Sequence, residues 1–199
     1  MNNINKEIIL IDNYDSFTYN LVDLLKNCTK KFNLEITVFR NDKITVNDIK
    51  KIKPDLIVFS PGPGNTKDSG VCLEIANSNL GIPLIGICLG HQVIAKSYGA
   101  NIIQSGKATH GKANQLDYIN QDFFNNLKLD FNVARYHSLI IDPSTLPDCL
   151  EILCKYQDVI MGIKHKEKKE YGLQFHPESF LTCNGDQILN LLIEEIFND

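Results

Sequence analysis

The run Glu7-Ile8-Ile9-Leu10-Ile11-Asp12 sets the fold of this chain. A short and nearly continuous apolar run is typical of a strand that is buried on both faces, as in a parallel sheet. The polar segment Asn13-Tyr14-Asp15-Ser16 follows it directly. Apolar residues then recur at helical spacing, at Phe17, Leu21, Leu24 and Leu25. This pattern predicts a strand, a turn and a helix, with Asp15 or Ser16 as the N-cap of the helix.

The same order of strand and helix continues through the first half of the chain. Further strands are predicted over Leu34–Arg40, Pro54–Phe59 and Pro83–Ile87, and helices over Val46–Ile52 and near Ser69–Asn77. Strands that alternate with helices indicate parallel pairing through right-handed crossovers. We therefore expect an α/β fold, an open and mostly parallel, flavodoxin-like sheet that is flanked by helices.

The second half of the chain carries shorter segments with alternating patterns. Strands are predicted over Ala100–Ile103, Gln115–Tyr118, Asn132–Tyr136, Glu151–Lys155, Ile160–Lys164 and Gly172–Phe175, and a closing amphipathic helix over Asp186–Phe197. These segments predict a β-rich elaboration of the sheet. Because no repeat or Gly/Ser linker interrupts the sequence, residues 1–199 are expected to form one domain.

Charge and hydropathy exclude several classes of function. The formal net charge is −4, with no basic block, so a nucleic acid is not expected as a partner. No run approaches 18 apolar residues, so no membrane span is expected. Six cysteines occur without a CxxC pair, which favours a reducing compartment over a secreted, disulfide-rich scaffold. We expect a cytoplasmic protein, with the plastid stroma as the open alternative.

The segment Gly86-Ile87-Cys88-Leu89-Gly90 joins an apolar strand to a helical pattern. Glycines two positions before and after a nucleophile allow the sharp strand-to-helix turn known as a nucleophile elbow. A helix N-terminus favours negative charge and hence a thiolate at Cys88, and the N–H of Leu89 could face an oxyanion. The alternative is a buried structural cysteine beside two turn glycines, and the pattern alone does not decide between them.

The segment Gln174-Phe175-His176-Pro177-Glu178-Ser179 lies at the end of another predicted strand. A thiolate nucleophile needs a proton carrier, and histidine is suited to that role near neutral pH. Glu178 could orient the imidazole of His176, as the third member of a triad does. A surface histidine without chemistry is the alternative. No further ligands at metal-binding spacing are evident, so no metal site is expected.

Two further segments could complete a site. Pro61-Gly62-Pro63-Gly64 combines stiff prolines with glycines that let backbone N–H groups approach a ligand, which suits part of an oxyanion hole as well as it suits a plain rigid turn. Arg135-Tyr136-His137-Ser138-Leu139 and His110-Gly111-Lys112 are weaker candidates for gripping a substrate. Because ligands bind at the carboxyl ends of parallel strands, one cleft could collect these segments.

In content, order and spacing these segments resemble the triad-type glutamine amidotransferases, from about Ile8 to Phe197. With Asn13–Asn20, the chain is similar to the small subunits of anthranilate synthase and aminodeoxychorismate synthase in particular. The resemblance implies that Cys88 is the nucleophile and that His176 and Glu178 complete the triad. It also implies glutamine-binding and oxyanion-hole positions at Gly62, Pro63, Gly64, Leu89, Gln92, Ser138 and Leu139.

The resemblance further implies partners. L-glutamine would be hydrolysed to glutamate, and the ammonia would pass to a separate, chorismate-binding large synthase subunit. The tryptophan and folate branches both fit. No cofactor or metal is expected in this chain, and magnesium is expected on the large subunit. The residues Ala113-Asn114-Gln115, where relatives usually carry Thr or Ser directly, and Cys183, at a position that is usually charged or polar, depart from the family pattern.

Three other functions remain as alternatives. A cysteine hydrolase of esters or peptides would release no ammonia from glutamine, and its acid often precedes a distant histidine, whereas Glu178 follows His176 by two positions. A catalytically silent chain that only stabilises its partner would not need Cys88. An amidotransferase for another synthase, such as one making guanylate or carbamoyl phosphate, is less compatible with Asn13–Asn20.

Overall fold

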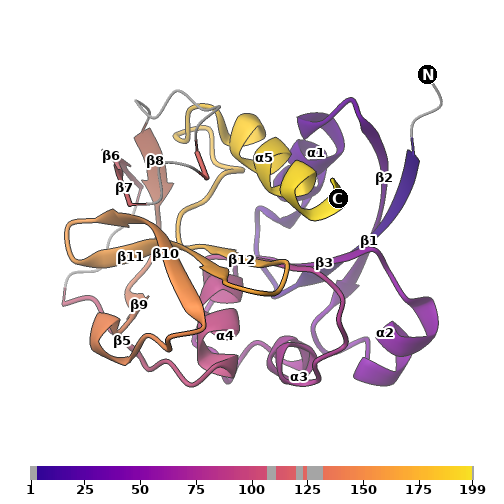
Figure 1. The fold of residues 1–199 in the computed structure, drawn as a ribbon, viewed down its shortest axis with the longest axis horizontal. Helices are drawn as coiled ribbons and strands as arrows, with labels where there is room; N and C mark the ends of the chain where they lie inside the picture. The colour runs from indigo at the N-terminus through magenta and orange to yellow at the C-terminus, as the bar shows by residue number, and fades with distance from the viewer. Residues whose placement is uncertain (1–3, 107–110, 120–122, 125–131, 199) are drawn as a thin grey trace.

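A computed structural model describes residues 4–106, 111–119, 123–124 and 132–198, and its centre is an eight-stranded sheet (Figure 1). The strand order is β2-β1-β3-β4-β12-β11-β10-β7. The parallel part consists of β1 (Ile4–Asp12), β2 (Phe32–Arg40), β3 (Leu56–Phe59), β4 (Leu84–Ile87) and β12 (Glu170–Leu173). Antiparallel strands extend it, namely β11 (Val159–His165), β10 (Leu150–Tyr156) and β7 (Asp117–Tyr118). The expected open, mostly parallel sheet is confirmed.

Helices cover both faces of the sheet (Figure 1). One face carries α1 (Thr18–Cys28) and α5 (Gly185–Phe197), and the other carries α2 (Val46–Ile52), α3 (Val71–Asn77) and α4 (Leu89–Ser97). Among the residues that the structure describes, no helix is both long and apolar enough to cross a bilayer.

The β1 strand explains why its sequence is apolar throughout. Its side chains alternate between two cores, because successive residues of a strand point to opposite faces. Ile8 and Leu10 pack into the core under α1 and α5. Ile9 and Ile11 pack into the core with α2, α3 and α4. All four side chains are fully buried, as expected for a strand that is covered on both faces.

The second half adds two small sheets, which confirms the predicted β-rich elaboration. β5 (Ile102–Gln104) pairs with β9 (Leu139–Ile141), and β6 (Lys112–Gln115) pairs with β8 (Asn132–Arg135). The single strand predicted over Gln115–Tyr118 is wrong. Its two ends belong to different sheets, because β6 pairs with β8 whereas β7 pairs with β10. The buried Leu116 separates β6 from β7. A short 3-10 helix, η1 (Pro143–Thr145), follows β9.

The predicted N-cap of α1 is also wrong. The helix begins at Thr18 with Phe17 at the cap position, and no side chain caps it. The carboxylate of Asp15 instead accepts a hydrogen bond from the backbone N–H of Phe17 (2.8 Å). The carboxylate of Asp12 accepts one from the hydroxyl of Thr18 (2.7 Å). The two acidic side chains therefore order the loop after β1, and neither caps the helix.

Candidate active site

Cys88 lies in the sharp turn between β4 and α4, with a strained backbone (φ 51°, ψ −97°). Gly86 and Gly90, on either side of Cys88, permit this turn because neither has a side chain that would collide with the atoms packed against it. A Cβ atom on Gly86 would lie 2.3 Å from the backbone of Gly90, and one on Gly90 would lie 2.6 Å from Phe59. Real side chains cannot approach so closely, so the spacing of glycine, cysteine and glycine follows from local geometry. Strain of this kind in a non-glycine residue is often found at functional sites.

The position of Cys88 differs from that of the structural cysteines. Cys72 and Cys154 are fully buried in apolar cores, and this burial raises the pKa of each thiol far above its usual value. The backbone N–H of Cys88 donates to the carbonyl of Leu173 (2.7 Å), which ties the turn to the end of β12. Cys88 also lines a cavity at the N-terminus of α4.

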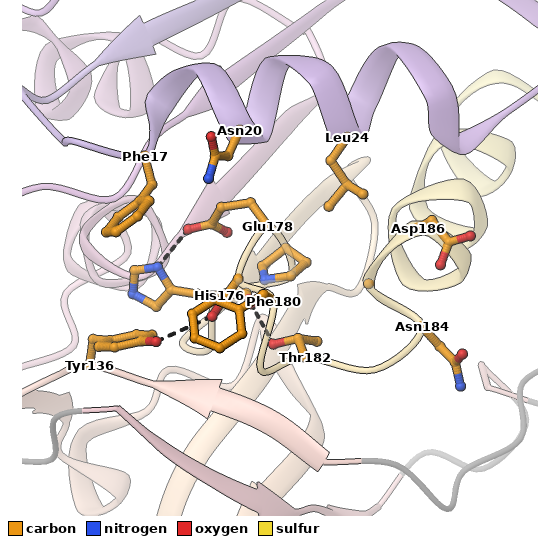
Figure 2. Close-up of a pocket in the computed structure, with 13 residues that line it drawn as sticks. Phe17, Asn20, Leu24, Tyr136, His176, Glu178, Phe180, Thr182, Asn184 and Asp186 are labelled. Atoms are coloured by element: carbon orange, nitrogen blue, oxygen red, sulfur yellow. Dashed lines mark hydrogen bonds and ion pairs between the residues drawn. The ribbon is translucent and has the colours of Figure 1, made fainter.

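His176 follows β12 and is held from several sides (Figure 2). Its Nδ1 atom lies 2.6 Å from Oε1 of Glu178, whose side chain is 1% exposed. Its backbone N–H donates to the carbonyl of Ala134 in β8 (3.1 Å), and its carbonyl accepts from the hydroxyl of Thr182. The ring of Tyr136 packs edge-on against the imidazole. The carboxylate therefore fixes the orientation of the ring through Nδ1 and leaves the buried Nε2 for a second partner.

The charges around His176 favour its protonated form. Burial alone would lower the pKa of the imidazole, but negative charge on the nearby Cys88 sulfur and the bond to Glu178 raise that pKa well above its usual value. Nε2 is buried, and no strictly aligned hydrogen bond reaches it within the described residues. Cys88 and His176 are thus close enough to act on one another electrostatically.

A cavity of about 150 Å³ opens beside Cys88. It is lined by Gly62, Pro63, Gly64, Cys88, Leu89, Gln92, Tyr136, His137, Ser138 and Leu139. All seven positions that the family resemblance implies for glutamine and the oxyanion hole are in this lining. Tyr136 and His137 also line the cavity. The only sequence signal for these two residues was that they belong to the candidate segment that ends at Leu139. His110 lies outside the described residues.

The loop over Pro61–Gly64 is positioned by Asn13, a contact that the sequence did not reveal. The backbone N–H of Asn13 donates to the hydroxyl of Ser60 (2.8 Å), and its side-chain amide donates to the carbonyl of Ser60 (2.9 Å). A Cβ atom on Gly62 would lie 2.5 Å from that of Asn13. The polar segment after β1 therefore supports the loop after β3 and brings it against the Cys88 turn.

His137 and His91 lie near the cavity but are poor proton carriers. Burial, together with the charges of Arg135 and His176, lowers the pKa of His137 to about 4. Complete burial lowers the pKa of His91, one turn along α4 from Cys88, to about 3. Both rings are therefore neutral at pH 7, whereas His176 binds its proton more tightly than an ordinary histidine. Of these three, His176 alone has the electrostatics of a partner for a thiolate.

A second cavity, of about 360 Å³, lies on the other side of His176 (Figure 2). Its lining comes from α1, from the loop after His176 and from the start of α5, including Phe17, Leu24, Glu178, Phe180 and Asp186. Phe17 and Phe180 are 54% and 90% exposed, which is unusual for large apolar side chains beside a cavity. In the described part of the chain, no group of three or more His, Cys, Asp or Glu residues could hold a metal ion.

The sequence of this chain matches a known protein family. The family model described as glutamine amidotransferase class-I matches residues 9–196. This chain belongs to the class-I glutamine amidotransferases. The family resemblance of the sequence is thereby confirmed.

Relatives of similar length carry two kinds of name. Anthranilate synthase component 2 of Cyanophora paradoxa is 47% identical over 190 residues, 94% of this chain and 97% of the relative. Aminodeoxychorismate synthase component 2 of Klebsiella aerogenes is 44% identical over 184 residues, 92% and 96% of the two chains. A protein of Bacillus subtilis that is 40% identical over 189 residues, 94% of this chain and 95% of that protein, is named for both activities, as aminodeoxychorismate/anthranilate synthase component 2.

Other relatives are longer. This chain spans 51% of a multifunctional tryptophan biosynthesis protein of Pichia angusta, at 43% identity over 97% of its own length. It spans 31% of a bifunctional TrpGD protein of Thermotoga maritima. A crystal structure from Thermoplasma acidophilum, named for part of a GMP synthase, superimposes with a TM-score of 0.82 over 98% of this chain and 95% of that one. At 23% identity, that match supports the fold alone.

Proposed function

We propose that this chain hydrolyses L-glutamine to glutamate and passes the ammonia to a separate chorismate-using synthase subunit. The observation that carries the proposal is the cavity beside Cys88, because its lining contains the nucleophile and every position that the family resemblance implies for glutamine. The pair of His176 and Glu178 adjoins it through Tyr136, which lines both cavities. The triad roles of Cys88, His176 and Glu178 are part of this proposal.

The reaction follows from the chemistry of these groups. The Cys88 thiolate attacks the side-chain amide carbon of glutamine, and backbone N–H groups of Leu89 and the Gly62–Gly64 loop stabilise the oxyanion. His176 gives its proton to the nitrogen as the C–N bond breaks, so ammonia leaves and a γ-glutamyl thioester remains on Cys88. The imidazole, now neutral, takes a proton from water, and the hydroxide cleaves the thioester to glutamate and the free thiol.

The synthase partner is inferred from the names of the relatives. Components numbered 2 of anthranilate and aminodeoxychorismate synthases are comparable to this chain in length. We therefore propose that the ammonia is used to form anthranilate, for tryptophan, or 4-amino-4-deoxychorismate, for folate, or both. The partner would bind chorismate and magnesium, and this chain would carry no cofactor of its own. We place the complex in the cytoplasm, with the plastid stroma as the alternative compartment.

Reconstitution with the chorismate-using subunit of the same organism tests the proposal. The wild-type chain should support product formation from either glutamine or ammonium salts. Cys88→Ala should abolish the glutamine-dependent reaction and leave the ammonia-dependent one unchanged, and the product formed identifies the branch. Glutamine-dependent synthesis that survives in Cys88→Ala would contradict the proposal and favour a silent, stabilising chain. Capture from the native cell of only a purine or pyrimidine enzyme would contradict the choice of partner.

A further inference from the structure

Gln174 lies against the sulfur of Cys88. The two residues directly follow neighbouring parallel strands, β12 and β4, which pair in register up to Leu173 and Ile87. Their side chains therefore meet at the same edge of the sheet. Gln174 Nε2 lies 3.6 Å from Cys88 Sγ, within hydrogen-bond distance for sulfur, and the side chain of Gln174 is fully buried. The triad reaction does not itself use this amide.

The orientation of this amide follows from a chain of hydrogen bonds. Gln92 Nε2 lies 3.0 Å from the carbonyl oxygen of Leu139, which can only accept, so that atom of Gln92 must be the NH₂ group. The same NH₂ group lies 3.1 Å from Gln174, which must therefore present its oxygen there. The NH₂ group of Gln174 then points at Cys88. The amide is thus a donor to the sulfur.

We propose that Gln174 is a positioning residue that donates a hydrogen bond to the Cys88 thiolate and connects it to the glutamine cavity through Gln92. A donor within a buried site stabilises the anion more than the neutral thiol. The bond also restricts the rotation of the sulfur about the Cα–Cβ bond of Cys88. Because Gln92 and Leu139 line the glutamine cavity, the side chain that holds the nucleophile is itself held by the substrate site.

Other charged and titratable groups around Cys88 do not duplicate this contact. His176, backed by Glu178, supplies a positive charge to the sulfur from the segment after β12. His91 on α4 is buried and neutral at pH 7, because its pKa is lowered to about 3 by its burial. His137, from the segment after β8, is neutral for the same main reason, its pKa being about 4. Gln174 therefore adds a neutral, fixed donor to the charge that His176 provides.

The test compares Gln174→Met with the wild-type chain. Methionine preserves the length of the side chain and removes the donor. The rate of alkylation of Cys88 by iodoacetamide, followed on its own peptide by mass spectrometry, reports the thiolate. At a pH below the midpoint of the alkylation profile, we expect this rate to fall about 10-fold, and the midpoint to rise by about one pH unit. For glutamine hydrolysis, kcat should fall and KM should change little, because Gln174 does not line the cavity.

Three further variants separate the hydrogen bond from packing. Gln174→Glu has the same shape as glutamine but places a carboxylate beside the sulfur, so its midpoint should rise further than that of Gln174→Met. Gln104→Met, at an exposed position of β5, is the matched control and should leave the profile unchanged. Gln92→Met removes the hydrogen bond that fixes the orientation of the Gln174 amide, so that amide can flip. The midpoint should rise by a smaller amount than in Gln174→Met.

An unchanged alkylation midpoint in folded Gln174→Met, as judged by thermal unfolding, would overturn the inference. If Gln174→Met does not fold, the alkylation profile of Gln92→Met decides in the same way: a raised midpoint supports the inference and an unchanged one overturns it. The inference rests on Cys88 as the proposed nucleophile, but its readout needs no turnover. A wild-type chain that releases no glutamate from glutamine would contradict the proposed function. The alkylation profiles would still decide the role of Gln174.

Discussion

At the residue scale, the chemistry of the site depends on the protonation of the His176 imidazole. His176 is buried, which by itself disfavours its charged form. The Cys88 sulfur and the Glu178 carboxylate overcome that effect and raise the pKa of the imidazole well above its usual value. The imidazole therefore favours its protonated form. In the proposed reaction, this form gives its proton to the departing nitrogen without first taking one from solvent.

Glu178→Gln should narrow the active pH range from the alkaline side. The substitution removes the negative charge of Glu178 and the carboxylate that pairs with Nδ1 of His176. In the native chain, that charge and that hydrogen bond each raise the pKa of His176. The pKa of His176 then falls, so the imidazolium is lost at a lower pH. We expect the alkaline limb of kcat/KM for glutamine to move to lower pH, and kcat at pH 8 to fall about 10- to 100-fold. An alkaline limb that stays in place would contradict this electrostatic role of Glu178.

At the element scale, three loops at the carboxyl edge of the sheet support one another. The turn that carries Cys88 needs the close contact of Gly90 with Phe59, the last residue of β3. The loop after β3 is pressed against Asn13, at the end of β1. A displacement in one loop is therefore passed to the next. Displacing reacting groups by about 1 Å can cost about 100-fold in rate.

Gly90→Ala should disturb both stability and activity. The added methyl group would lie 2.6 Å from backbone and side-chain atoms of Phe59. We expect a loss of about 1–3 kcal/mol in the free energy of unfolding and a fall of about 100-fold in glutamine hydrolysis. Gly81→Ala is the control, because nothing lies within 4 Å of the new atom and only its positive φ of 71° is unfavourable. That control should lose about 1–2 kcal/mol and keep its activity.

Much of this arrangement could be predicted from local patterns. The apolar runs indicated the strands of the sheet, and the glycines around Cys88 indicated the turn. The hydrogen bonds of Asn13 to Ser60 and of Gln174 to Cys88 could not be predicted, because each joins residues that are 47 or 86 positions apart. The division between β6 and β7 was also missed. It depends on which strands are available for pairing, and no local pattern records that.

At the scale of the whole molecule, the cavity beyond His176 opens on a face with exposed aromatic side chains (Figure 2). Phe17 and Phe180, which line this cavity, are each more than half exposed. Aromatic side chains of this kind are enriched at protein interfaces. Because ammonia released into water would be protonated and lose its nucleophilicity, a synthase subunit that covers this face would also protect the transfer.

Phe180→Asp should weaken assembly with the synthase subunit. If Phe180 is a central contact, its loss costs at least about 2 kcal/mol, or about a 30-fold rise in the Kd of the complex, as measured by calorimetry. Glutamine hydrolysis by the isolated chain should be unchanged, because Phe180 does not line the cavity beside Cys88. Ile4→Asp, on an equally apolar residue that is 60% exposed at the opposite end of β1, is the control and should leave the Kd unchanged.

The most direct measurement is to mix the wild-type chain with isotopically labelled glutamine, quench it in acid within one turnover, and locate the label by peptide mass spectrometry. A γ-glutamyl group should be found on the peptide that contains Cys88, and it should be absent in Cys88→Ala. Glutamate released at the wild-type rate by Cys88→Ala, or a label on another residue such as the exposed Cys183, would contradict the proposed nucleophile.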